Sequence, residues 1–196
     1  MKVLLGIWTL SLAVLAPAAS RSEAAESNSP VKDISSPVRE NRERAASRVL
    51  SDRSTTIKTL IQLAGAKEEK PQWRGPKDLA VELLGEYRAT EAIDLLVKDV
   101  SYRVPAISPA DDSLVGYTCA KALIEIGSPS VQAIVRCLQQ PAKEKELMLF
   151  AHVIRRIDGE DVGLFRLEAA LKETPLGAKK NIESLIEIYK AKRTDF

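Results

Sequence analysis

Apolar residues recur at helical spacing along most of this chain, and two stretches of the pattern are rough copies of each other. Residues 79–97 and residues 118–135 each have the pattern of an amphipathic helix, a tight turn and a second amphipathic helix. The copies are offset by about 40 residues, a period typical of helical repeats that bury their faces against neighbouring repeats. The pattern therefore predicts an all-α fold, an α-solenoid in which helix pairs form a superhelical stack.

Segments on both sides of the two copies extend this array. Residues 38–64 have the spacing of one long helix, or of two helices broken near residues 51–53 with Asp52 as the cap of the second. Residues 147–171 resemble a divergent third copy. Residues 176–192 predict a closing helix, whose polar face is rich in Lys and Glu as the end of a stack requires.

The turns between paired helices are also visible in the sequence. In the middle copy Gly127 begins the turn, Ser128 is expected to cap the next helix, and Pro129 suits the first helical position. In the third copy the turn is expected at residues 158–161. The second helix of that copy carries the apolar residues Val162, Leu164, Phe165, Leu167 and Leu171.

The first 19 residues have the pattern of a signal peptide. Lys2 gives a short positive start, residues 3–15 are apolar, and small residues favour cleavage near Ala18/Ala19, with a second possible site at Ala24–Ala25. The alternative is an uncleaved membrane anchor, but the apolar run is shorter than the ~20 residues that a bilayer span needs. We therefore expect an exported protein, periplasmic or secreted, with no membrane association after cleavage.

The rest of the chain divides into a linker and one domain. Residues 20–37 are mostly Ser, Glu, Ala, Asn and Pro, with hardly any large apolar side chain. Such a segment cannot bury a core, so it is predicted to be a disordered linker. Residues 38–196 then form the helical repeat domain.

Charge and composition argue against nucleic acid as a partner. Lys and Arg total 29 and Asp and Glu total 27, which leaves a net charge of +2. The two signs alternate along the predicted helices, as on a solvated face, and aromatic residues are only 5% of the chain. The chain therefore lacks both the basic stripe and the stacking platforms of a nucleic-acid-binding protein.

The repeated residues resemble those of the HEAT-repeat superfamily, in particular the short bacterial HEAT-like repeats also found in phycobilisome lyases. Residues 122–129, Ala-Leu-Ile-Glu-Ile-Gly-Ser-Pro, fit the pattern of the turn well, and residues 84–87 fit it in part, with Arg88 where Gly is usual. The resemblance covers residues 77–172. It implies a right-handed array of helix pairs that offers a groove or face to a partner.

No set of catalytic residues is recognisable. The chain has no phosphate-binding loop, no dinucleotide fingerprint and no nucleophile elbow, and the sequence around its single histidine, His152, supplies no nucleophile. The acidic residues Asp158, Glu160 and Asp161 lack the spacing of a calcium loop and equally suit a helix N-terminus. We therefore expect a protein that is not an enzyme, with no catalytic residue, no metal site and no cofactor.

Side chains that could contact a partner lie outside the repeated positions. The long connection at residues 101–112 is an insertion, and insertions in arrays tend to line one face. The candidates for partner binding are Trp73, Tyr102, Arg103, His152, Arg155 and Arg156. For the charged residues the alternative is a role in solubility, and for Trp73 it is to plug the end of the core.

The two cysteines are a candidate disulfide. Cys119 and Cys137 lie at equal distances from Ser128, so an antiparallel helix pair places them at the same height. Interhelical distances of about 8–10 Å exceed the Cα separation that a disulfide prefers, so small neighbours would have to allow a close approach. Export permits oxidation. Two buried thiols that act as small core residues are an equal alternative.

These observations together favour a binding role. We expect an exported HEAT-like protein that acts as a protein–protein interaction scaffold or binding module, with another protein or a peptide as its partner. One alternative is an enzyme accessory or small-ligand-binding protein related to bilin lyases, although export argues against that substrate. Another is a structural role in the cell envelope with self-association.

Overall fold

Within residues 52–67, 75–105 and 114–191, which the computed structural model describes, every regular element is a helix. This confirms the all-α class for these residues, and none of the helices has both the length and the apolar character needed to cross a bilayer. The predicted signal peptide, the linker and the chain up to residue 51 lie outside the described residues. The elements are α3 (Arg53–Ala64), α4 (Pro76–Glu86), η1 (Thr90–Ala92), α5 (Ile93–Lys98), α6 (Thr118–Ile126), α7 (Ser128–Cys137), α8 (Glu144–Glu173), η2 (Leu176–Ala178) and α9 (Lys179–Lys190).

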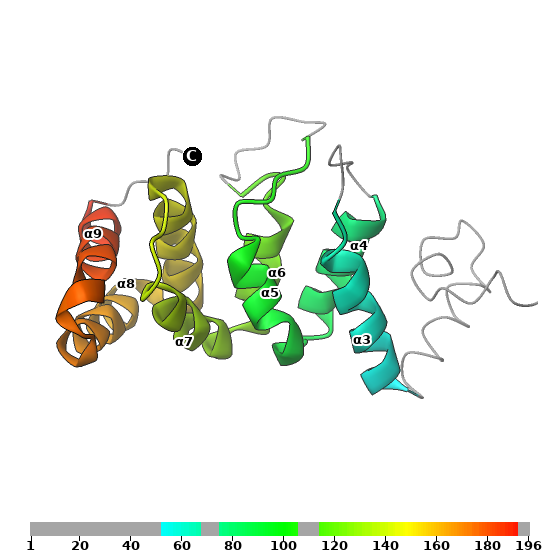
Figure 1. The fold of residues 1–196 in the computed structure, drawn as a ribbon, viewed down its shortest axis with the longest axis horizontal. Helices are drawn as coiled ribbons and strands as arrows, with labels where there is room; N and C mark the ends of the chain where they lie inside the picture. Colours follow the sequence, from blue (N-terminus) through cyan, green and yellow to red (C-terminus); the bar gives the residue numbers. More distant parts are fainter. Residues whose placement is uncertain (1–51, 68–74, 106–113, 192–196) are drawn as a thin grey trace, which may run out of the picture.

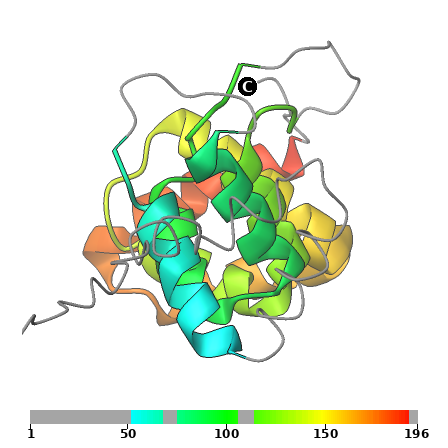
Figure 2. The same cartoon turned by 90° about the vertical axis from the view of Figure 1, so that its right-hand side faces the viewer.

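The helices follow one another along the long axis of the molecule, from α3 at one end to α9 at the other (Figure 1). Helix α4 packs against α3 and α6, and α6 packs in turn against α8; α5 packs against α6 and α7, and α7 against α8. Figure 2 looks along this row with α3 nearest the viewer. Helices α4 to α8 therefore each contact at least two other helices along the row.

A single apolar core runs through these contacts, and small residues let α4 and α6 approach closely. Ala80 and Cys119 are both buried. The tightest approach is at Gly85, where an added Cβ would lie 2.8 Å from the Cα of Ala122. Only glycine fits there, because the conflict is with backbone that cannot move aside.

Two helix starts show why the chain folds locally as it does. Helix α3 begins after Asp52, whose carboxylate accepts a hydrogen bond from the Thr55 N–H at 3.1 Å. The predicted cap at Asp52 is thus confirmed. Helix α4 begins at Pro76, a position where the missing N–H of proline costs no helical hydrogen bond.

Glycines turn the chain inside the second and third helix pairs. Gly127 has φ 88° and ψ −146°, and Gly159 has φ 74° and ψ −178°, a region that is essentially restricted to glycine. Gly127 rather than Ser128 is the N-cap of α7, because Ser128 is already helical. The turn expected at residues 158–161 is the kink at Gly159, which divides α8 into two helical halves.

The turn between α4 and α5 has no glycine at its position of positive φ. Arg88 has φ 48° and is the one non-glycine residue with positive φ among the described residues. The Arg88 N–H donates to the Gly85 carbonyl at 2.8 Å, and the Ala89 N–H donates to the Leu84 carbonyl at 2.9 Å. This pair of hydrogen bonds is a Schellman motif, which normally has glycine at the position of Arg88.

Replacing Arg88 by glycine is therefore expected to stabilise the protein by about 0.5–1 kcal/mol. The left-handed conformation costs a residue with a Cβ about 1–2 kcal/mol, and the greater freedom of glycine in the unfolded chain returns part of that gain. Denaturant unfolding measures the change. Arg88→Ala is the matched control, because it removes the side chain and keeps the strain; an equal gain in both variants would contradict the explanation.

Candidate binding site

The larger of two hollows described below lies between α5, α7 and the start of α8. Its volume is about 460 Å³. The buried side chains of Val97, Ala133 and Phe150 give it an apolar floor. The full lining is Asp94, Val97, Lys98, Ala133, Arg136, Cys137, Gln140, Pro141, Ala142, Glu146 and Phe150.

Charged groups of both signs surround this floor. Asp94 and Lys98 come from α5, Arg136 from α7 and Glu146 from the first turn of α8. Arg136 Nη2 lies 3.8 Å from Asp94 Oδ1, and both side chains are largely exposed, so this ion pair is weak and easily opened. An apolar floor with a mixed-charge rim resembles the centre and edge of a protein–protein interface.

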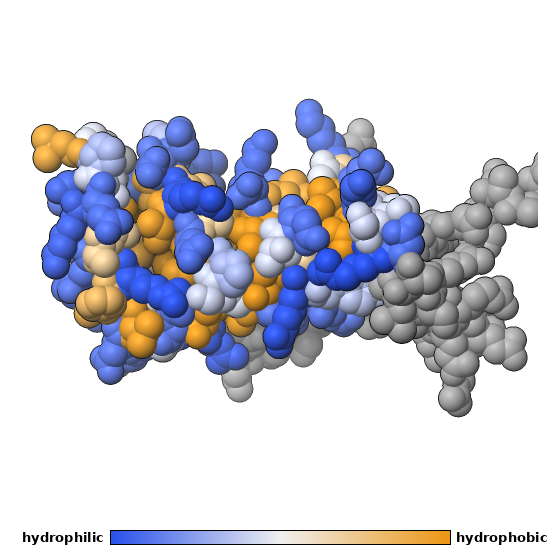
Figure 3. Space-filling view, turned by 90° about the horizontal axis from the view of Figure 1, so that it is seen from below, coloured by the Kyte–Doolittle hydropathy of each residue, from blue (hydrophilic) through white to orange (hydrophobic). Residues whose placement is uncertain are grey.

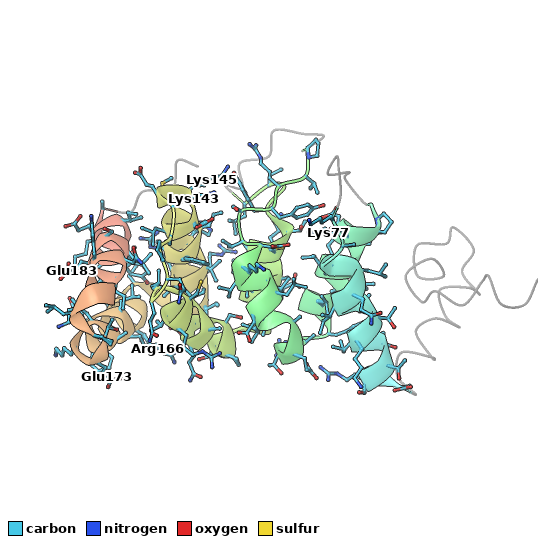
Figure 4. All side chains as sticks on the ribbon, viewed as in Figure 1. Lys77, Lys143, Lys145, Arg166, Glu173 and Glu183 are labelled. Atoms are coloured by element: carbon cyan, nitrogen blue, oxygen red, sulfur yellow. The ribbon has the colours of Figure 1, made fainter. Side chains whose placement is uncertain are left out.

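A smaller hollow of about 290 Å³ follows between α7 and the second half of α8. Its lining is Val131, Gln132, Val135, Phe165, Arg166, Ala169, Ala170 and Glu173. Figure 4 shows Arg166 and Glu173 on the lower side of the molecule, away from Lys77, Lys143 and Lys145. Seen from below in Figure 3, apolar surface is exposed in patches between charged side chains.

The predicted contacts Tyr102 and Arg103 lie together, but each is engaged within the protein. Lys77 Nζ lies 4.6 Å from the centre of the Tyr102 ring. The guanidinium carbon of Arg103 lies 5.4 Å from the centre of the Tyr117 ring, and Lys145 Nζ lies 5.1 Å from the same centre. The two candidates therefore belong to a group of cations stacked on aromatic rings.

The Lys77 side chain, which lies against Tyr102, is almost fully buried. Its Nζ makes an ion pair with Asp99 Oδ2 at 3.0 Å and donates to the Ala66 carbonyl at 3.4 Å. Only 10% of the Lys77 side chain is exposed, whereas 31% of the Asp99 side chain is. Lys77 thus ties together α4, the segment after α3 and the end of α5.

The candidates on α8 divide between structure and surface. Arg155 Nη2 donates to the Tyr189 carbonyl at 2.5 Å, and its guanidinium lies over the Tyr189 ring at 4.6 Å. The Tyr189 hydroxyl donates to the Gly159 carbonyl at 2.5 Å. The contacts of Arg155 and Tyr189 together fix α9 on the kink of α8. His152 is half-buried and Arg156 is exposed. Trp73 lies outside the described residues.

Both cysteines are free thiols in the structure. Cys119 is 1% exposed, whereas Cys137 is half-buried and lines the larger hollow. Burial raises the pKa of Cys119 to about 12, with Asp99 adding to the rise. Burial also raises the pKa of Cys137, and Glu146 and Asp94 raise it further. The two thiols thus lie in different surroundings, Cys119 in the core and Cys137 at the hollow, and the structure does not bridge them.

One of the acidic residues at the kink of α8, Asp158, makes an ion pair within the protein. Arg166 Nη1 lies 3.2 Å from Asp158 Oδ2 and donates to the Ser128 hydroxyl at 2.9 Å. Arg166 therefore joins the turn at Gly127 to the kink at Gly159. Among the described residues, no three His, Cys, Asp or Glu side chains are grouped closely enough to hold a metal ion.

Apart from Cys137, sequence reasoning missed the residues that line the hollows, although a signal for the smaller hollow was present. The second half of α8 carries two apolar stripes, one at 164, 167 and 171 and another at 162, 165 and 169. One such stripe is enough to bury a helix against a core, so the second stripe was the signal of an exposed apolar surface. Leu167 of the first stripe is fully buried, whereas Phe165 of the second is 72% exposed.

Comparisons with known proteins add no relative to this description. No protein-family model matches the chain, and no curated protein and no solved structure matches it significantly.

Proposed function

We propose that this protein is an exported binding module, an α-solenoid of HEAT-like helix pairs that takes a peptide or protein partner in the hollow between α5 and α7. The single observation that carries this proposal is that hollow of about 460 Å³, with its buried apolar floor and its rim of mixed charge. A hollow of this size can receive one or two apolar side chains of a partner.

The packing supports the solenoid. Helices α4, α6 and α8 contact one another in succession, and α5, α7 and α8 do the same. A residue with positive φ recurs at the turn of each successive helix pair. These residues are Arg88, Gly127 and Gly159. Such recurrence is typical of stacked repeats, in which every unit contacts only its neighbours.

The chemistry of the rim indicates the kind of partner. Asp94 and Glu146 balance Lys98 and Arg136, so the hollow has no strong preference for one sign of charge. A polyanion such as nucleic acid finds no basic stripe there. The rim suits a peptide with an apolar anchor residue flanked by charges of both signs.

The surroundings of Cys137 favour binding over covalent chemistry. A reactive cysteine needs neighbours that stabilise its thiolate. Glu146 and Asp94 instead raise the pKa of Cys137 further above its usual value. This supports a protein that is not an enzyme, and it weighs against the alternative of a ligand-attaching accessory.

Selection from a random peptide display library tests the proposal. We expect the wild-type protein to enrich peptides with a shared apolar anchor. Ala142→Trp places a large side chain in the hollow from a partly buried position outside the helices, and this variant should bind the same peptides at least 10-fold more weakly. Arg156→Glu, on exposed surface of α8, is the control and should bind normally. No enrichment, or equal binding by Ala142→Trp, would contradict the proposal; loss of binding in Arg156→Glu alone would place the site at the basic candidates.

Export is tested independently by the mass of the protein recovered from the periplasm or the medium. A chain that begins near Ala19 is expected from the signal-peptide pattern. A protein that stays in the cell with residues 1–19 attached would contradict it.

A further inference from the structure

The second half of α8 exposes more apolar surface than packing within one chain requires. Val162 is 50% exposed and Phe165 is 72% exposed, and the two lie three residues apart on one face of the helix. Isolated exposed apolar residues are common on protein surfaces. Here, however, Phe165 borders a hollow with an apolar lining, so a projecting ring and a recess lie side by side.

The recess has the chemistry to receive such a ring. Val131 and Val135 of α7 and Ala169 and Ala170 of α8 form its apolar walls, and its volume is about 290 Å³. A surface that carries both a projection and a matching recess can close on itself across a two-fold axis, because each copy then offers both halves of the contact.

Charge on the same surface is self-complementary. Arg166 and Glu173 both line the hollow, at equal distances along the chain on either side of Ala169 and Ala170. If two α8 helices cross antiparallel at these alanines, Arg166 of each copy lies opposite Glu173 of the other. The small side chains at the crossing allow the helices to approach closely.

Both members of this pair are able to make the contact. Glu173 makes no ion pair with any described residue. The contacts of Arg166 to Asp158 and to Ser128 both use Nη1, which leaves Nη2 for a second carboxylate. Two charge-assisted contacts related by symmetry would fix the antiparallel direction.

We propose that a second copy of this chain docks on the α7–α8 hollow across a two-fold axis, with Phe165 of each copy in the hollow of the other and Arg166 paired with Glu173. This surface is distinct from the hollow between α5 and α7, so the dimer does not depend on the proposed peptide binding.

Analytical ultracentrifugation of the full mature chain over a range of about 1–200 μM tests the dimer. We expect a monomer–dimer equilibrium in the wild type and an increase of at least 10-fold in the dissociation constant for Phe165→Glu and for Glu173→Arg. Glu183→Arg on α9, which makes the same charge change at an exposed position, should leave the equilibrium unchanged. Thermal unfolding of each variant shows whether the fold is retained.

A disulfide at the predicted axis tests the geometry. Ala169→Cys in a Cys137→Ala background is expected to form a covalent dimer on oxidation, because equivalent residues meet at a two-fold axis. Adding Phe165→Glu should abolish the cross-link. A protein that is monomeric at every concentration would overturn the proposal. A dimer that is insensitive to both Phe165→Glu and Glu173→Arg would overturn it as well.

Discussion

Replacing Asp99 by alanine is expected to destabilise the protein by about 3 kcal/mol, because it leaves the buried ammonium group of Lys77 without a carboxylate. Removing one partner of a buried ion pair typically costs about 3–5 kcal/mol. The lower end applies here since 31% of the Asp99 side chain is exposed, so water screens part of the interaction. The Ala66 carbonyl and the Tyr102 ring remain near Lys77 Nζ but carry no full negative charge.

Denaturant unfolding of Asp99→Ala, Lys77→Met and the double variant checks this explanation. The double variant should regain most of the lost stability, because methionine fills a similar volume without a charge. A loss below about 1 kcal/mol in Asp99→Ala would show that the pair behaves as a surface ion pair. The Lys77–Asp99 pair would then not be the structural tie between α4 and the end of α5.

Above pH 9 the protein is expected to lose stability through Cys119. The pKa of this thiol is about 12 in the folded protein, chiefly because of burial, against 9.0 for a thiol in its ordinary surroundings. Between these values the unfolded chain releases the proton and the folded chain keeps it, so the free energy of unfolding falls by about 1.4 kcal/mol per pH unit. Below pH 9 both states hold the proton, and the thiol contributes no pH dependence.

The comparison of wild type with Cys119→Ala isolates this effect. Burial also raises the pKa of Tyr87 and of Tyr189, and these groups add alkaline pH dependence to both proteins. Chemical unfolding at pH 7 to 10.5 should therefore give curves that run together up to about pH 8 and then diverge, with the wild type losing stability faster. Parallel curves would show that Cys119 is not held protonated.

The helix pairs could be predicted from the sequence because their signals are local. Apolar spacing predicted α6 and α7, Asp52 predicted the start of α3, and Gly127 and Gly159 lie in the turns that were expected. Arg88 already stood out as a departure from glycine, and its positive φ is the structural counterpart. In each case a few neighbouring residues determine the conformation.

The candidate site could not be predicted, because it depends on which residues distant in sequence meet. Lys77 follows Pro76 at the start of a helix and has the sequence context of a solvated lysine. In the structure its side chain is buried and pairs with Asp99, 22 residues further along the chain. Arg155 was a candidate for partner binding, and in the structure its guanidinium contacts Tyr189, 34 residues further along the chain. The hollow between α5 and α7 depends on residues from three segments, and no repeat position marks it.

The measurement that tests the central claim most directly is the binding of a selected peptide before and after alkylation of Cys137. This thiol lines the larger hollow, whereas Cys119 is buried and stays protonated, so a maleimide should modify Cys137 alone in the folded protein. We predict that fluorescence anisotropy shows at least a 10-fold loss of affinity after modification of the wild type. The same reagent should have no effect on Cys137→Ala. Undiminished binding by the fully modified wild-type protein would contradict the assignment of the hollow as the binding site.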